Sequence, residues 1–191
     1  MPFHPSTAPV PIGFSDGSFR VLPIGPAMSE ADLEAVLASR EGLRIWSDSE
    51  WPEDDFSLEA NTEDLAMHAD EHARRIAFGY SVQDALGRVL GSVYINRLAD
   101  SFEHYPVDEA ARARLAPFVG RVEFWVRTDA LALRPALFDA LRAWLARDWP
   151  WPVVFGARRG MADAVALYES RGLSLRARLV SDTGRVQALY A

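Results

Sequence analysis

Residues 68 to 72 read His68-Ala69-Asp70-Glu71-His72, an arrangement whose side chains could bind a metal. Histidines at positions i and i+4 share one face of a helix, so both could bind one zinc ion, with Glu71 as the general base. A catalytic zinc also needs a third protein ligand, and no signature further along the chain predicts one. Because the pattern is also that of a solvated helix face, we expect no metal site here.

A second stretch, from Gly120 to Arg147, predicts a strand that runs directly into a helix. Pro135 fits the first helical turn, where its missing N–H is not needed. The unpaired N–H groups and the dipole at such a helix start suit an anion such as phosphate, although the same pattern is that of any strand–helix unit in an α/β core. The alternating and the helically spaced apolar residues are Val122, Phe124, Val126, Leu137, Leu141, Trp144 and Leu145.

The composition excludes several kinds of chemistry. The chain of 191 residues has no cysteine, which removes disulfides, thiol nucleophiles and thiolate metal sites. Its 20 basic residues are all arginine, which excludes Schiff-base chemistry and a lysine-bearing phosphate loop. A net charge of −7 argues against nucleic-acid binding and is compatible with a cationic substrate. With no apolar run long enough for a membrane helix and no secretory signal, we expect a cytoplasmic, bacterial protein without nucleic-acid or membrane partners.

The remaining pattern predicts the elements that must position these residues. Prolines favour an extended arm over residues 1–16, followed by one domain over residues 17–191. Residues 42–60 are less regular, and we expect a loop or a short helix near the surface. They contain Trp46 and Trp51, which could line a cleft or pack on the domain. Periodicity predicts these further elements: a strand at 19–22, a helix at 29–37 with Ser29 as N-cap and Asp32 in capping-box register, a helix at 62–75 capped by Asn61 or Thr62, a hairpin at 76–95, a short helix at 108–115, a strand at 153–155, a helix from 161 ended by Gly172, and a hairpin at 173–190.

The order of these elements and one local motif resemble the GNAT superfamily of N-acetyltransferases over residues 18–190. That family often shows N-x-x-A-x-x-L-Y-x-x-x-G-F after its fifth strand, and the stretch from Met161 to Leu173 keeps Ala164, Leu167, Tyr168 and Gly172. The region of Trp51 and the 76–95 hairpin resemble the branch that acetylates protein N-termini and small amines. The resemblance implies a GNAT-like α/β (α+β) fold, with a mixed, mostly antiparallel sheet of six to seven strands flanked by helices on both faces.

The same resemblance implies direct transfer of an acetyl or short acyl group from acetyl-CoA, or a related acyl-CoA, to an unidentified primary amine. The acceptor is expected to be a small-molecule amine or a protein N-terminus, and a homodimer is left open. The family's glycine-rich pyrophosphate loop is replaced by residues 129–136, which contain no glycine. The residues expected to bind acetyl-CoA are Phe124, Trp125, Val126, Arg127, Leu133, Arg134, Arg158 and Arg159.

Two residues are implied to carry the chemistry. Tyr168 matches the family's tyrosine that protonates the departing thiolate. Glu123 is the candidate base; alternatively, it is an ordinary strand residue that faces solvent and pairs with Arg121 or Arg127. In this fold the second helix borders the acceptor groove, so the expected substrate-binding residues are Trp46, Trp51, His68, Glu71, His72 and Tyr94. Two rival hypotheses are a cofactor-free binding module of the same fold and a zinc hydrolase built on His68, Glu71 and His72.

Overall fold

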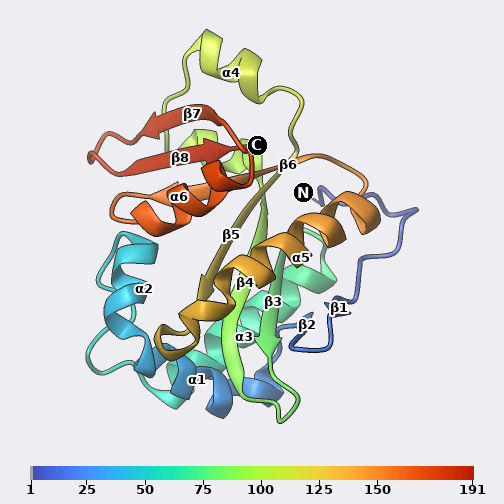
Figure 1. Cartoon of the computed structure of the whole chain (residues 1–191), viewed down its shortest axis with the longest axis vertical. Coiled ribbons are helices and arrows are strands. Elements are labelled where there is room, and N and C mark those ends of the chain that lie inside the picture. Colours follow the sequence, from blue (N-terminus) through green and yellow to red (C-terminus); the bar gives the residue numbers. More distant parts are fainter. Residues whose placement is uncertain (1) are drawn as a thin grey trace.

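The computed structural model describes residues 2–191, and Met1 of the expected arm lies outside the described residues. It shows one eight-stranded sheet in the order β1-β2-β3-β4-β5-β6-β8-β7 (Figure 1). The expectation of a mixed, mostly antiparallel sheet is confirmed, and among residues 2–191 β5 and β6 form the one parallel pair. The strands are β1 (Phe14–Ser15), β2 (Arg20–Pro23), β3 (Ala77–Gln83), β4 (Val89–Arg97), β5 (Gly120–Val126), β6 (Val153–Arg158), β7 (Leu175–Val180) and β8 (Val186–Tyr190).

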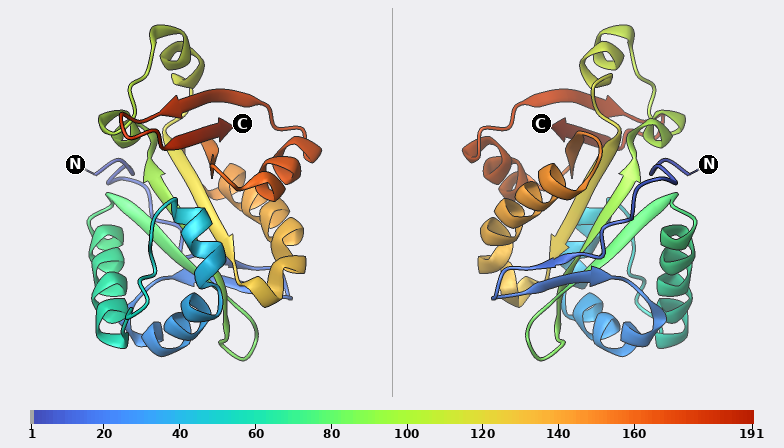
Figure 2. Two further views of the ribbon diagram at one scale, coloured as in Figure 1. Left: turned by 90° about the vertical axis from the view of Figure 1, so that its left-hand side faces the viewer. Right: turned by 90° about the vertical axis from the view of Figure 1, so that its right-hand side faces the viewer.

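Helices cover both faces of the sheet, as expected. Figure 2 shows α1, α2 and α3 on one face and α5 and α6 on the other. None of the helices between residues 2 and 191 has the length and apolar character that crossing a membrane requires. The helices are α1 (Ser29–Ala38), α2 (Arg40–Ser47), α3 (Leu58–Ala73), α4 (Glu109–Leu115), α5 (Arg134–Asp148) and α6 (Ala162–Ser170), with the 3₁₀ segments η1 (Pro26–Met28), η2 (Leu98–Glu103) and η3 (Thr128–Leu133).

Two helix starts differ from those expected. Helix α3 begins at Leu58, because the hydroxyl of Ser57 accepts the first free N–H, from Ala60 at 3.2 Å. Asn61 therefore lies inside the helix, where its amide donates to the carbonyl of Ser29 at 3.0 Å. Ser29 is not the N-cap of α1, since it is already helical and its hydroxyl donates back to η1.

The expected N-terminal arm lies against the core on the side of α5. The ring of Phe3 stacks on Trp151 at 5.1 Å, and the Tyr80 hydroxyl donates to the carbonyl of Pro11 at 2.7 Å. The arm ends in the two-residue strand β1, which pairs with β2. This strand was not expected, and it raises the number of strands to eight.

Strands β5 and β6 separate along their length, and this separation organises the site. They pair at only three positions, from Gly120 opposite Val153 to Val122 opposite Phe155. The second half of β5 therefore has β4 as a neighbour on one side and no strand partner on the side of β6. Backbone groups on that side are available to an extended ligand.

Candidate functional site

A cleft of about 370 Å³ lies where β5 and β6 separate. Its walls come from α2, the end of β5, the start of α5, and the loop between β6 and α6. Of the residues expected to bind acetyl-CoA, Phe124, Trp125, Val126 and Arg134 line this cleft, and so does Trp46 from the expected substrate-binding set. Sequence reasoning missed the lining residues Ser39, Gly42, Thr128, Leu131, Gly160 and Met161.

The turn between β5 and α5 folds without glycine. None of its residues has a positive φ angle, so the turn itself needs no glycine. Thr128 and Leu131 instead present side chains to the cleft. The carboxylate of Asp129 is held by Arg88 at 2.5 Å and by Arg127 at 2.8 Å, so its negative charge is compensated by two arginines.

One arginine lines the cleft, and three more line a cavity that adjoins it. Arg134, the first residue of α5, lines the cleft and has no ion-pair partner among residues 2–191. The loop after β6 is shared with an adjoining cavity of about 490 Å³, which is lined by Arg158, Arg159 and Arg178. Positive charge at a helix start and beside it suits a phosphate group. Two acidic residues, Glu41 and Asp163, also line the cleft.

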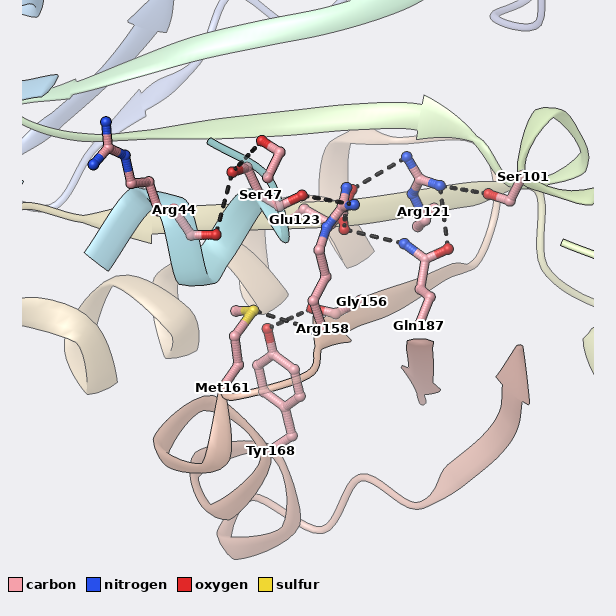
Figure 3. A network of polar contacts seen from close by, with 11 residues as sticks. Arg44, Ser47, Ser101, Arg121, Glu123, Gly156, Arg158, Met161, Tyr168 and Gln187 are labelled. Atoms are coloured by element: carbon pink, nitrogen blue, oxygen red, sulfur yellow. Dashed lines mark hydrogen bonds and ion pairs between the residues drawn. The ribbon is translucent and has the colours of Figure 1, made fainter. Parts of the chain in front are cut away.

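Glu123 is a buried member of an ion-pair network next to Phe124, the first residue of β5 that lines the cleft. In Figure 3 the side chains of Arg121, Arg158 and Gln187 converge on it, at 3.1, 3.4 and 3.1 Å. Burial alone would raise the pKa of Glu123, but the two guanidinium groups outweigh it and lower that pKa. The alternative that Glu123 faces solvent is therefore wrong: it is 4% exposed, and its pairing with Arg121 is accompanied by Arg158.

The position next to Glu123 on β6 favours a glycine. A Cβ atom on Gly156 would lie 3.0 Å from Cγ of Glu123, a tight contact that Glu123, held by Arg121, Arg158 and Gln187, would have to relieve by moving. Arg158, two residues further, also donates to the carbonyl of Ser47 at the end of α2. The network thus joins β5, β6, β8 and α2 at one point.

Tyr168 reaches this point from α6. Its side chain is fully buried against Phe138 and Phe155, and its hydroxyl donates to the carbonyl of Gly156 at 3.3 Å (Figure 3). Burial, and next the charge of Glu123, raise the pKa of Tyr168, so the hydroxyl stays protonated. Tyr168 does not itself line the cleft, but Gly156 is the first residue of β6 beyond the paired section.

The two histidines of α3 have different surroundings. The ring of His68 lies between Glu71, at 3.3 Å, and Asp64, at 3.6 Å, whereas the ring of His72 packs against Phe78 at 5.1 Å. Burial lowers the pKa of His72. Within residues 2–191, no three histidine, aspartate or glutamate side chains are grouped so that they could hold a metal. The motif that suggested a zinc hydrolase therefore does not gather a ligand set.

Other residues of the expected substrate-binding set gather on the same face of the sheet. The ring centroids of Trp46 and Tyr94 are 5.6 Å apart. His68, on α3, has its ring centroid 5.2 Å from that of Tyr94, on β4. Trp51 packs against Phe56 beside them. Of the expected cofactor-binding residues, Arg127 is paired with Glu34 at 2.6 Å, and Leu133 precedes α5 without lining the cleft.

The sheet order, the separated parallel pair and the cleft at that separation define a GNAT-like fold. The structure of ribosomal-protein-S5-alanine acetyltransferase from Vibrio fischeri matches with a TM-score of 0.66 and 12% identity, over 94% of this chain and 95% of that one. RimJ of Mycobacterium smegmatis, in complex with CoA-disulfide, matches at 0.67 and 12%, over 91% and 81%. The microcin C7 self immunity acetyltransferase MccE, in complex with acetyl-CoA and AMP, matches at 0.67 and 10%, over 95% and 96%. No protein-family model and no curated protein sequence matches the chain.

Proposed function

We propose that this protein transfers an acetyl or short acyl group from acyl-CoA to a primary amine. The observation that carries the proposal is the cleft between β5 and β6, which combines an unpaired strand edge with the start of α5. Several solved structures of the same fold hold CoA or acetyl-CoA. The acceptor is a small-molecule amine or a protein N-terminus. The likeness to ribosomal-protein acetyltransferases supports a protein acceptor, whereas the likeness to the microcin C7 self immunity acetyltransferase shows that the fold is not confined to ribosomal-protein acetyltransferases.

The proposed position of acyl-CoA follows the chemistry of the cleft walls. The pantetheine arm pairs with the free backbone edge of β5, from Phe124 to Arg127. The pyrophosphate lies at the start of α5, next to Leu133, where the guanidinium group of Arg134 has no ion-pair partner within the described part of the chain. The 3′-phosphate lies in the adjoining cavity, where Arg159 is the more available partner because Arg158 is already bonded to Glu123.

In the proposed reaction the neutral amine attacks the thioester carbonyl carbon, and the carbon–sulfur bond then breaks. The attacking nitrogen loses a proton to water, the departing sulfur takes a proton from the Tyr168 hydroxyl, and Tyr168 regains one from solvent, so that the products are the amide and the CoA thiol. The raised pKa keeps Tyr168 protonated but makes it a weak acid, and this role requires the hydroxyl, now buried on the carbonyl of Gly156, to become accessible when acyl-CoA binds. Glu123 is a weak base because its pKa is lowered, so we assign it to holding Arg121 and Arg158, the second of which lines the adjoining cavity. Because the chain has no cysteine, an acyl-cysteine intermediate is excluded.

Release of CoA thiol tests the proposal with little background, because the protein contains no thiol of its own. Acetyl-CoA is incubated with the protein and a panel of primary amines, and free thiol is measured with a chromogenic disulfide. We expect amine-dependent release of thiol in the wild type. Tyr168→Phe should lower turnover by about 10²-fold or more with little change in acetyl-CoA affinity, and unchanged turnover would remove Tyr168 from the mechanism.

A cofactor-free binding module is the second candidate. It is favoured by the side chains of Thr128 and Leu131, which occupy the position where the family's glycine loop exposes backbone. It predicts neither binding of acyl-CoA nor release of thiol with any amine.

A further inference from the structure

A second group of polar side chains, some buried and some partly exposed, lies between α1, α3 and β4, and the chemistry proposed above does not use it. Asp32 of α1 is 4% exposed. It faces Asn61, Asp64 and His68 of α3 and the hydroxyl end of Tyr94 on β4. We refer to these five residues and Ser92, which lies two positions before Tyr94 on the same face of β4, as the Asp32 cluster.

The carboxylates of the Asp32 cluster lack a cationic partner of full charge. Among residues 2–191 no arginine forms an ion pair with Asp32 or Asp64, and His68 approaches Asp64 only at 3.6 Å. Burial, assisted by the nearby charge of Asp64, raises the pKa of Asp32 to about 6. Glu123, which is buried to the same degree, differs from Asp32 because it is paired with two arginines.

Buried hydrogen-bond acceptors in the cluster are also without partners. The amide nitrogen of Asn61 donates to the Ser29 carbonyl, whereas its amide oxygen, in a residue 1% exposed, has no partner in the described structure. The buried hydroxyl of Ser92 lies beside the Tyr94 hydroxyl without a normal hydrogen bond. Leaving such groups unpaired is costly, and an ammonium group would supply three donors to them.

A row of aromatic rings connects the cluster to the cleft. Trp46 lines the cleft, and its ring contacts the ring of Tyr94. The ring of Tyr94 in turn contacts the ring of His68. Trp125 also lines the cleft, and it stands directly opposite Ser92 on β5. The faces of tryptophan and tyrosine rings attract cations, so this row favours a positively charged ligand chain between the cleft and Asp32. Neither Tyr94 nor Asp32 lines the cleft, so such a chain would have to part these packed side chains as it binds.

We propose that the Asp32 cluster binds a second positive charge of the acceptor, so that the protein prefers diamines to monoamines of equal length. The inference rests on the proposed function for the acetylated end of the acceptor, but the binding of the charged end rests on the cluster alone. Asp32 is then a specificity-determining residue. The net charge of −7 favours the approach of such a substrate.

The test compares 1,4-diaminobutane with n-butylamine, which has one amine fewer on the same carbon chain. Steady-state rates of thiol release and ligand-induced shifts in melting temperature are measured for the wild type, Asp32→Asn and Asp70→Asn. The last variant removes the same charge from an exposed position of α3, where Asp70 pairs only with Arg74. We expect Asp32→Asn to raise KM for 1,4-diaminobutane about tenfold or more, and to leave KM for n-butylamine within about twofold, whereas Asp70→Asn changes neither.

The outcomes separate the two proposals. If Asp32→Asn lowers kcat equally for both amines, Asp32 acts on the reacting amine and the subsite is refuted. Equal KM values for the two amines in the wild type also overturn it. If acetyl-CoA neither binds nor reacts, the proposed function fails, while a melting shift with 1,4-diaminobutane that is lost in Asp32→Asn would still support the cation site. If that shift is absent as well, both proposals fail.

Discussion

Glu123 and Asp32 are each only 4% exposed, yet the charges around them have opposite signs. Two arginines and a glutamine amide hold Glu123 ionised, whereas Asp32 faces another carboxylate and a partly paired histidine. A buried charge is stabilising only when its partners remain in place. The two residues therefore predict opposite effects when each is replaced by its neutral isostere.

Glu123→Gln should destabilise the protein by about 3 kcal/mol at pH 7, because it leaves Arg121 and Arg158 buried without a counter-charge. Because the pKa of Glu123 is lowered in the folded state, this residue stabilises the fold at pH values above the ordinary pKa of glutamate. That contribution to stability is lost as the pH falls through the lowered pKa. The difference between wild type and variant should therefore shrink in acid. Urea unfolding at pH 7 and pH 4 measures it, and a variant as stable as the wild type at pH 7 would contradict the network's role.

Asp32→Asn should stabilise the protein. Between the ordinary pKa of 3.8 and the folded value of about 6, the folded state holds the proton more tightly than the unfolded state. Stability therefore falls as the pH rises through this range, and the penalty is complete above it. At pH 8 the variant should gain roughly 2 to 3 kcal/mol, with almost no gain near pH 3.5. If the variant gained the same free energy of unfolding at both pH values, the ionised carboxylate of Asp32 would not be the cause of the destabilisation.

At the scale of elements, periodicity in the sequence was the reliable guide. It predicted the β3–β4 hairpin, α5 with Pro135 in its first turn, and α6 with Gly172 behind it at a φ angle of +81°. The strand that it missed is β1, whose two residues form a strand only because β2 is next to them. Helix α2 agrees with the alternative of a short helix near the surface, but it begins at Arg40, before the segment expected to be irregular. The start of α3 was missed because Ser57 precedes a polar turn without apolar spacing.

The glycines of α2 and β6 allow a prediction about these elements. Gly42 lies in the helical interior of α2, and a Cβ atom there would meet nothing closer than Oγ1 of Thr128 at 3.8 Å. Gly42→Ala should therefore stabilise the protein by about 0.5 to 1 kcal/mol. Gly156→Ala should destabilise it, because its Cβ would press on Glu123. Thermal unfolding of the two variants measures both effects, and equal melting temperatures would contradict the described packing.

At the scale of the whole molecule, the sequence predicted the fold from the order of its elements, but it predicted the site only in part. Phe124, Trp125, Val126 and Arg134 could be placed at the cleft because strand and helix ends follow from local patterns. The sequence could not predict the partners of Arg158 or the surroundings of Asp32, because both depend on elements that lie far apart in the chain. Asp32 in particular has the sequence context of an exposed capping residue, yet α3 and β4 cover it.

The central claim is that acyl-CoA binds between β5 and β6, and calorimetric titration of acetyl-CoA tests it most directly when three proteins are compared. Gly42→Phe places a ring in the cleft, whereas Gly42→Ala alters the same position and leaves the space open. The wild type and Gly42→Ala should bind one acetyl-CoA per chain with similar affinity, and Gly42→Phe should lose binding while remaining folded. Absence of binding to the wild type, or equal binding to Gly42→Phe, would contradict the account.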